Sequence, residues 1–223
     1  MNNLSSSSKR FVRKCPYCAS IFGHTITDSL WNSRVLPDVD GVAIVPTRGM
    51  LVPGWLLIVP EEHILSVQQL PEGRGEAVWR RATEARDLLT PIFGAVTMFE
   101  HGATKSESPV GCGVDHAHLH VVPLQFDLLK AARAHPLGGL LRWHEVQEKA
   151  CWSDGDLEEP YLWLSSPTSG EWIARGPIPS QFFRRVIARE IGKPESFDWR
   201  DDDGVGEIQY THSRLNPMSV AEG

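Results

Sequence analysis

The sequence predicts an α+β fold in which helices pack on an antiparallel sheet and a carboxyl-terminal extension follows. Three observations predict it. The apolar runs Val42–Val45 and Trp55–Val59 are bounded by glycine and proline, as strands often are. The segment from Pro71 to Leu89 has apolar residues at helical spacing. Histidine fills every second position of His116–His120, which is the period of a strand.

The elements are justified in chain order. Residues 1–10 are serine-rich and then basic, which is typical of a flexible leader. The two apolar runs are expected to pair as a hairpin through Pro46–Gly54. A helix over 71–89 places four apolar side chains on one face, namely Val78, Ala82, Ala85 and Leu89. Thr97–Glu100 is expected to form a further short strand.

The segment beyond the histidine strand is expected to be folded. It carries five tryptophans, Trp143, Trp152, Trp163, Trp172 and Trp199, and so much aromatic surface would form an exposed patch unless it packed. Residues 179–192 are typical of a helix with Ser180 near its start and Gly192 at its end. The predicted organisation is a leader over 1–10, a main domain over 11–125, an extension packed on it over 126–210, and a frayed tail over 211–223.

Charge and composition restrict the class of partner and the compartment. The chain has 22 lysines and arginines against 28 aspartates and glutamates, a net charge of −6. This balance disfavours nucleic acid and anionic membranes as partners, so any phosphate binding must be local. The longest apolar run, Trp55–Val59, is too short to cross a bilayer, and no secretory signal precedes it. We expect a cytoplasmic protein whose four cysteines are thiols or metal ligands.

The alternating histidines are the strongest functional signal. In a strand, His116, His118 and His120 share one face, and the intervening apolar residues form the other. A lone histidine is more often a hydrogen-bonded core residue than a functional one, but strict alternation favours a site.

A glycine-rich segment leads into these histidines. Gly111 and Gly113 have no β-carbon, so backbone N–H groups there can approach a phosphate or an oxyanion closely. Cys112 between them is interpreted as a small packing residue rather than a second nucleophile.

Three segments resemble one family. Gly111–Pro123 resembles the signature of the histidine triad superfamily of nucleotide hydrolases and transferases, His-φ-His-φ-His-φ-φ with φ apolar. Val52–His63 is similar to the family's strand that ends in Pro-x-x-His. Cys15–Cys18 is similar to the cysteine pair that opens many bacterial members. The resemblance covers about residues 11–125 and implies the histidine-triad fold for that part.

The resemblance implies a covalent mechanism. His118 would attack the α-phosphate of a nucleoside phosphate derivative, such as a dinucleoside polyphosphate, a phosphoramidate or a nucleotide conjugate, and form a nucleotidyl-histidine. His120 would donate to the bridging or leaving oxygen, and Gly111, Cys112 and Gly113 would hold the non-bridging oxygens. No organic cofactor is implied, and the partner is a nucleotide-type small molecule.

The cysteine pair by itself is compatible with a redox couple, half of a zinc site or chance. The resemblance supplies two further ligands and implies a structural Zn²⁺ held by Cys15, Cys18, His63 and His116. The alternative of one ion on all three triad histidines is disfavoured, because positions i and i+4 of a strand lie about 13 Å apart.

Departures from the family pattern limit the substrate that can be inferred. Trp55 stands where many members have histidine, and Thr47 stands where an aspartate commonly holds the ribose. In the extension, Arg184 or Arg185 could reach a distal phosphate, against the alternative of a solvated pair.

Two other functions stay open, a catalytically silent nucleotide-binding module and an enzyme that removes 5′-adenylate from nucleic acid. A homodimer is compatible with the sequence.

Overall fold

The computed structural model describes residues 15–23, 30–108, 110, 113–146 and 159–216. The predicted leader over 1–10 and the loop residues Gly111 and Cys112 lie outside these ranges. The strands are β1 (Leu36–Val39), β2 (Val42–Pro46), β3 (Leu56–Pro60), β4 (Val96–Gly102), β5 (Leu119–Pro123), β6 (Arg142–Glu145), β7 (Tyr161–Ser166) and β8 (Gly170–Arg175). The α-helices are α1 (Pro16–Ser20), α2 (Arg74–Phe93), α3 (Leu128–Ala134), α4 (Phe182–Glu190) and α5 (Val205–Leu215).

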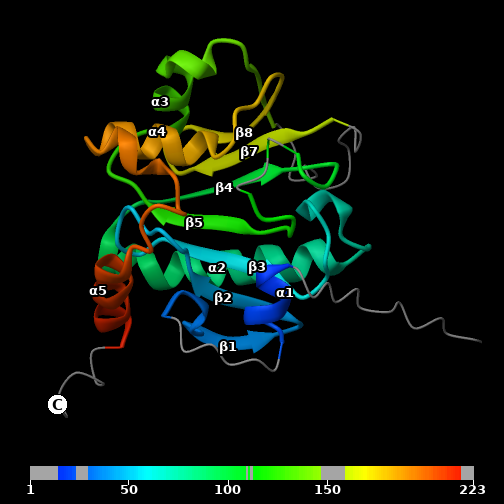
Figure 1. Cartoon of the computed structure of the whole chain (residues 1–223), viewed down its shortest axis with the longest axis vertical. Coiled ribbons are helices and arrows are strands. Elements are labelled where there is room, and N and C mark those ends of the chain that lie inside the picture. Colours follow the sequence, from blue (N-terminus) through cyan, green and yellow to red (C-terminus); the bar gives the residue numbers. More distant parts are fainter. Residues whose placement is uncertain (1–14, 24–29, 109, 111–112, 147–158, 217–223) are drawn as a thin grey trace, which may run out of the picture.

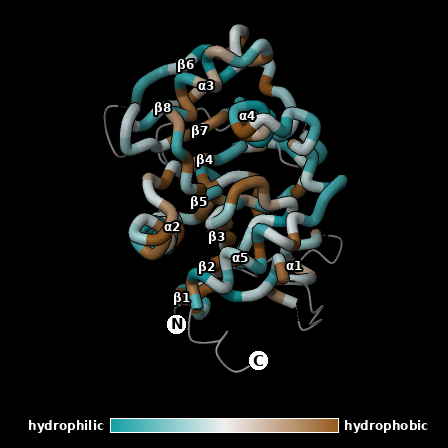
Figure 2. The backbone as a smooth tube through the Cα atoms, turned by 90° about the vertical axis from the view of Figure 1, so that its left-hand side faces the viewer, coloured by the Kyte–Doolittle hydropathy of each residue, from teal (hydrophilic) through white to brown (hydrophobic). Residues whose placement is uncertain are grey.

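The described strands form one eight-stranded sheet in the order β1-β2-β3-β5-β4-β7-β8-β6, and each neighbouring pair is antiparallel. Helix α2 lies along one face, and α1 and α4 lie on the other, as the edge-on view shows (Figures 1 and 2). The predicted α+β class is therefore confirmed. Within the described ranges, no helix has both the length and the apolar character that crossing a membrane requires.

The central elements follow the prediction closely. β2 and β3 pair in register, with Ala43 opposite Val59, so the predicted hairpin is confirmed. α2 begins and ends slightly later than the periodicity indicated, and its apolar stripe packs on one face of the sheet against Leu119 and Val121. A helix in the extension is confirmed as α4, which starts after Gln181 rather than at Ser180.

The histidine strand is shorter than predicted. β5 begins at Leu119, so His116 and His118 precede the hydrogen-bonded ladder. The physical reason is that the backbone there bonds elsewhere: the N–H of His116 donates to Val114 and that of Ala117 donates to Ile64. Ala117 is still buried on the α2 side of the sheet, as the alternation predicted.

The extension continues the sheet instead of forming a separate layer. β4 pairs with β5 along one edge and with β7 along the other, and β8 and β6 follow outward. Domain boundaries near residue 125 stay a prediction. The expectation of a frayed end from Thr211 is wrong for its first part, because α5 runs through Leu215 and buries Ile208 and Thr211.

Glu100 is a fully buried carboxylate on β4 that fastens the loop after His63 to the sheet. The N–H of Val67 donates to its Oε1 at 2.7 Å, and the hydroxyl of Tyr161 donates to its Oε2 at 2.5 Å. Burial raises the pKa of Glu100 to about 7, because the loss of hydration outweighs the two hydrogen bonds.

Glu100→Gln is expected to change how stability depends on pH. The folded state raises the pKa of Glu100 from 4.5 to about 7, so the contribution of this carboxyl is full below pH 4.5 and is lost as the pH rises to about 7. The free energy of unfolding falls by at most about 1.4 kcal/mol per pH unit. Urea unfolding of the wild type and the variant measures this fall. Both proteins have the same histidines, so the effect of histidine titration cancels in the difference between them. A wild-type-minus-variant difference that stays flat across this window contradicts the shift.

Candidate functional site

Four side chains from three separate segments form one cluster. Cys15 precedes α1 and Cys18 lies within it, His63 follows β3, and His116 precedes β5. Their ligand atoms all lie within 4.8 Å of one another. The Sγ of Cys15 lies 3.5 Å from Nδ1 of His116, and the Sγ of Cys18 lies 3.5 Å from Nδ1 of His63 and 3.6 Å from Nδ1 of His116.

The cluster fits a tetrahedral zinc ion. Bonds of about 2.3 Å to sulfur and about 2.0 Å to nitrogen place such ligand atoms roughly 3.3–3.8 Å apart, which includes the three separations above. The Nε2 of His116 donates to the carbonyl of Pro60 at 2.7 Å, so its Nδ1 carries the lone pair that a metal needs. Burial raises the pKa of the Cys15 thiol to about 11, and a bound dication would reverse that effect. These residues could therefore bind a metal such as zinc.

The middle histidine is held in one tautomer. The Nδ1 of His118 donates to the carbonyl of His116 at 2.7 Å, which leaves the lone pair on Nε2. His118 is 7% exposed, and burial lowers its pKa to about 4, so the ring is neutral at physiological pH. A neutral imidazole with a fixed lone pair has the electronic form that a nucleophile requires.

The last histidine is fixed by a different contact. His120 lies on β5 opposite Leu57 and Phe99, and its ring stacks on Phe99 at 4.4 Å between centroids. The indole Nε1 of Trp55 donates to Nδ1 of His120 at 3.0 Å. The rings of His118 and His120 lie 4.8 Å apart, so these two predicted catalytic residues are neighbours.

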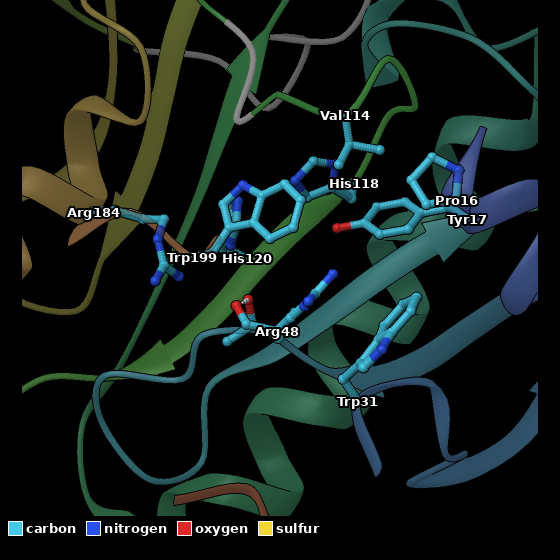
Figure 3. Close-up of a pocket in the computed structure, with 10 residues that line it drawn as sticks. Pro16, Tyr17, Trp31, Arg48, Val114, His118, His120, Arg184 and Trp199 are labelled. Carbon is cyan, nitrogen blue, oxygen red and sulfur yellow. Dashed lines mark hydrogen bonds between the residues drawn. The ribbon is translucent and has the colours of Figure 1, made fainter. Parts of the chain in front are cut away.

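These two histidines open into one partly enclosed cavity. Ten residues line it: Pro16, Tyr17, Trp31, Thr47, Arg48, Val114, His118, His120, Arg184 and Trp199. Figure 3 shows the Tyr17 hydroxyl pointing into the cavity beside His118. Because Tyr17 lies between the two cysteines, the Cys/His cluster and the cavity share the wall that α1 forms.

The cationic side of the cavity has one arginine from the extension and one from the segment between β2 and β3. Arg184 on α4 is 1% exposed, and its guanidinium donates to the carbonyls of Phe197 at 2.8 Å and of Gly49 at 2.5 Å. Arg48 reaches over the ring of Trp199 and pairs with Asp203. Arg185 does not line the cavity; its guanidinium lies over Phe197. A role of Arg184 in distal phosphate recognition stays a prediction.

The structure therefore gathers His118 and His120 on one cavity and His63 and His116 on the adjoining cluster. Gly113, with φ of +81°, adopts a conformation that favours glycine, and a β-carbon there would lie 1.9 Å from the guanidinium of Arg200. Its role in phosphate binding is untested. Sequence reasoning missed Tyr17, Trp31 and Arg48 as cavity residues, and only the position of Tyr17 within the cysteine motif could have indicated one of them.

Comparison with known proteins gives matches among solved structures. No family model and no curated protein sequence matches the chain. Among solved structures, the chain is similar to a Hit-like protein involved in cell-cycle regulation from Bartonella henselae, crystallised with an unknown ligand. The identity is 17%, the alignment covers 51% of this chain and 82% of that one, and the TM-score is 0.41. Similarity at this level does not extend to individual residues or to function.

Proposed function

We propose that this protein is a histidine-triad nucleotide hydrolase or transferase that acts at the α-phosphate of a nucleoside phosphate derivative. One observation carries the proposal: His118 is held by the His116 carbonyl at 2.7 Å with its Nε2 lone pair available, on the wall of a cavity that two arginines also line. The sequence motif that contains His116, His118 and His120 is a second observation that supports this reaction class.

The proposed reaction has two displacements. In the first, Nε2 of His118 attacks the α-phosphorus; a phosphorus–nitrogen bond forms, and the bond to the leaving group breaks with its electron pair. The ring then carries a positive charge that its Nδ1–H shares with the His116 carbonyl. In the second, the oxygen of water in a hydrolase, or of an acceptor in a transferase, bonds to phosphorus and loses its proton to solvent. The phosphorus–nitrogen bond breaks, and its electron pair returns to Nε2. His120 donates a hydrogen bond to the departing oxygen.

The metal cluster has a structural role in this proposal. Cys15, Cys18, His63 and His116 would hold the ion, which supplies a cross-link between α1 and the segments after β3 and before β5. Tyr17 and Pro16 then keep their place in the cavity wall. No organic cofactor enters the reaction. A cytoplasmic location, a nucleotide-type partner and a homodimer stay predictions.

A panel of substrates tests the proposal. Purified protein is incubated with dinucleoside polyphosphates, nucleoside phosphoramidates and nucleotide sugars, and mononucleotide release is measured by chromatography. We expect at least one class to release mononucleotide at a rate proportional to protein concentration. Nucleotide binding by calorimetry without turnover of any class would favour the silent binding module instead.

A further inference from the structure

The contact between Trp55 and His120 restricts which nitrogen of His120 carries a proton. The indole N–H is a donor only, since the indole nitrogen offers no lone pair. Because it points at Nδ1 of His120 at 3.0 Å, the proton of the neutral imidazole must lie on Nε2. His120 is therefore fixed as a donor through Nε2.

The same contact opposes protonation of His120. An imidazolium carries a proton on both nitrogens, so its Nδ1–H would face the Trp55 N–H, donor against donor. Trp55 is fully buried and packs edge-on against Phe99, so rotation of the indole would disrupt the core.

The surroundings of His120 also oppose its protonation. His120 is 2% exposed, and the titratable groups that face it are His118 before β5, His101 on β4 and Arg184 on α4. Burial is the largest cause that holds the pKa of His120 well below its usual value, and these three groups lower it further. Each of these three titratable groups is either neutral or cationic, so none of the three stabilises an imidazolium.

A neutral donor limits the reaction that it can assist. It can stabilise negative charge on a departing oxygen by a hydrogen bond, but it has no acidic proton to transfer. Amines and alkoxides need a proton as they depart, whereas a phosphate departs as a stable anion. The Tyr17 hydroxyl in the cavity does not replace an imidazolium, because a phenol is a much weaker acid.

The cavity is also built for an anionic leaving group. Arg184 and Arg48 line it, and no carboxylate is among its lining residues in the described part of the chain. The guanidinium of Arg184 lies over the ring of Trp55 at 5.0 Å, so the residue that fixes His120 also helps to orient this cation. Arginine keeps its charge at any physiological pH.

We propose that Trp55 is a positioning residue that keeps His120 a neutral hydrogen-bond donor, and that the substrate is a nucleoside phosphoanhydride rather than a phosphoramidate or an alkyl ester. This inference rests on the proposed function and chooses among its substrate classes. In the first step, the bond between His118 Nε2 and the α-phosphorus forms, the anhydride bond to the bridging oxygen breaks, and the electron pair leaves with a phosphate group. No proton transfer is needed for that departure.

Two substrates that transfer the same adenylyl group to His118 but expel different leaving groups test the inference. Diadenosine triphosphate expels ADP, and adenosine 5′-N-butylphosphoramidate expels butylamine. We expect kcat/KM for the anhydride to exceed that for the phosphoramidate by about 100-fold or more. Equal or faster phosphoramidate cleavage overturns the inference but leaves the proposed function intact. If neither compound, nor its guanosine counterpart, forms a nucleotidyl adduct or is cleaved, the proposed function fails.

The role of Trp55 is tested without substrate. In ¹⁵N-histidine-labelled wild-type protein, His120 should show an unprotonated Nδ1 and a protonated Nε2 throughout about pH 5–8. Trp55→Phe should lose this single tautomer and reduce the preference for the anhydride about tenfold or more. Trp163→Phe, a buried tryptophan on the opposite face of the sheet, is the matched control and should change neither. A protonated Nδ1 in the wild type overturns the assignment even if Trp55→Phe fails to fold.

Discussion

His118→Ala is expected to lower turnover of the accepted substrate by about a thousandfold or more. His118 combines a fixed Nε2 lone pair with a place on the cavity wall, and His120, the nearest other imidazole, has its Nδ1 engaged by Trp55. Neighbouring groups therefore cannot replace the nucleophile. The measurement is single-turnover release of mononucleotide under saturating protein.

The control for this substitution is His144→Ala, because His144 is an exposed histidine on β6. It should leave the rate unchanged. Mononucleotide release near the wild-type rate in His118→Ala would show that the nucleophile is a different group.

Cys15→Ser combined with Cys18→Ser is expected to remove a bound zinc ion and to lower thermal stability. The ion would cross-link α1, which carries Tyr17 of the cavity wall, to His63 and His116. At a free zinc concentration about 100 times the dissociation constant, the ion contributes about 2.7 kcal/mol. For a chain of this size, that loss lowers Tm by roughly 5–10 °C.

Elemental analysis of protein purified without chelators or added metal measures this directly, with one zinc per chain expected. Cys151→Ser, a cysteine outside the proposed ligand set, should retain the metal. A wild-type protein that contains no metal under these conditions refutes the site and leaves Cys15 and Cys18 as buried thiols.

The local parts of the fold could be predicted because their signals lie within short segments. The β2–β3 hairpin and α2 follow from apolar runs and helical spacing, and the structure confirms them. β6 was missed because it is mostly exposed at the sheet edge, and β8 beside it was missed because it is only partly buried. Both strands mix polar and aromatic residues, so no alternation marks them. α5 was missed because its buried face is narrow.

Some parts of the site could also be predicted from the sequence, and others could not. The motif placed His116, His118 and His120 together, and the structure brings Cys15 and Cys18 to the same region. The contact between Trp55 and His120 could not be predicted, because it depends on the register of β3 against β5. Arg184 and Trp199 reach the cavity only because the extension folds back over it after β8, a long-range arrangement that no local pattern encodes.

Trapping the covalent intermediate tests the central claim most directly. Protein is mixed with excess substrate and quenched in alkaline denaturant that preserves phosphorus–nitrogen bonds. Intact-protein mass spectrometry then measures the mass of the adduct, and peptide mapping locates it. We predict a gain of one nucleotidyl group on His118, absent from His118→Ala and formed at least as fast as steady-state turnover. Release of mononucleotide with no adduct, or with the adduct on another residue, would contradict covalent catalysis by His118.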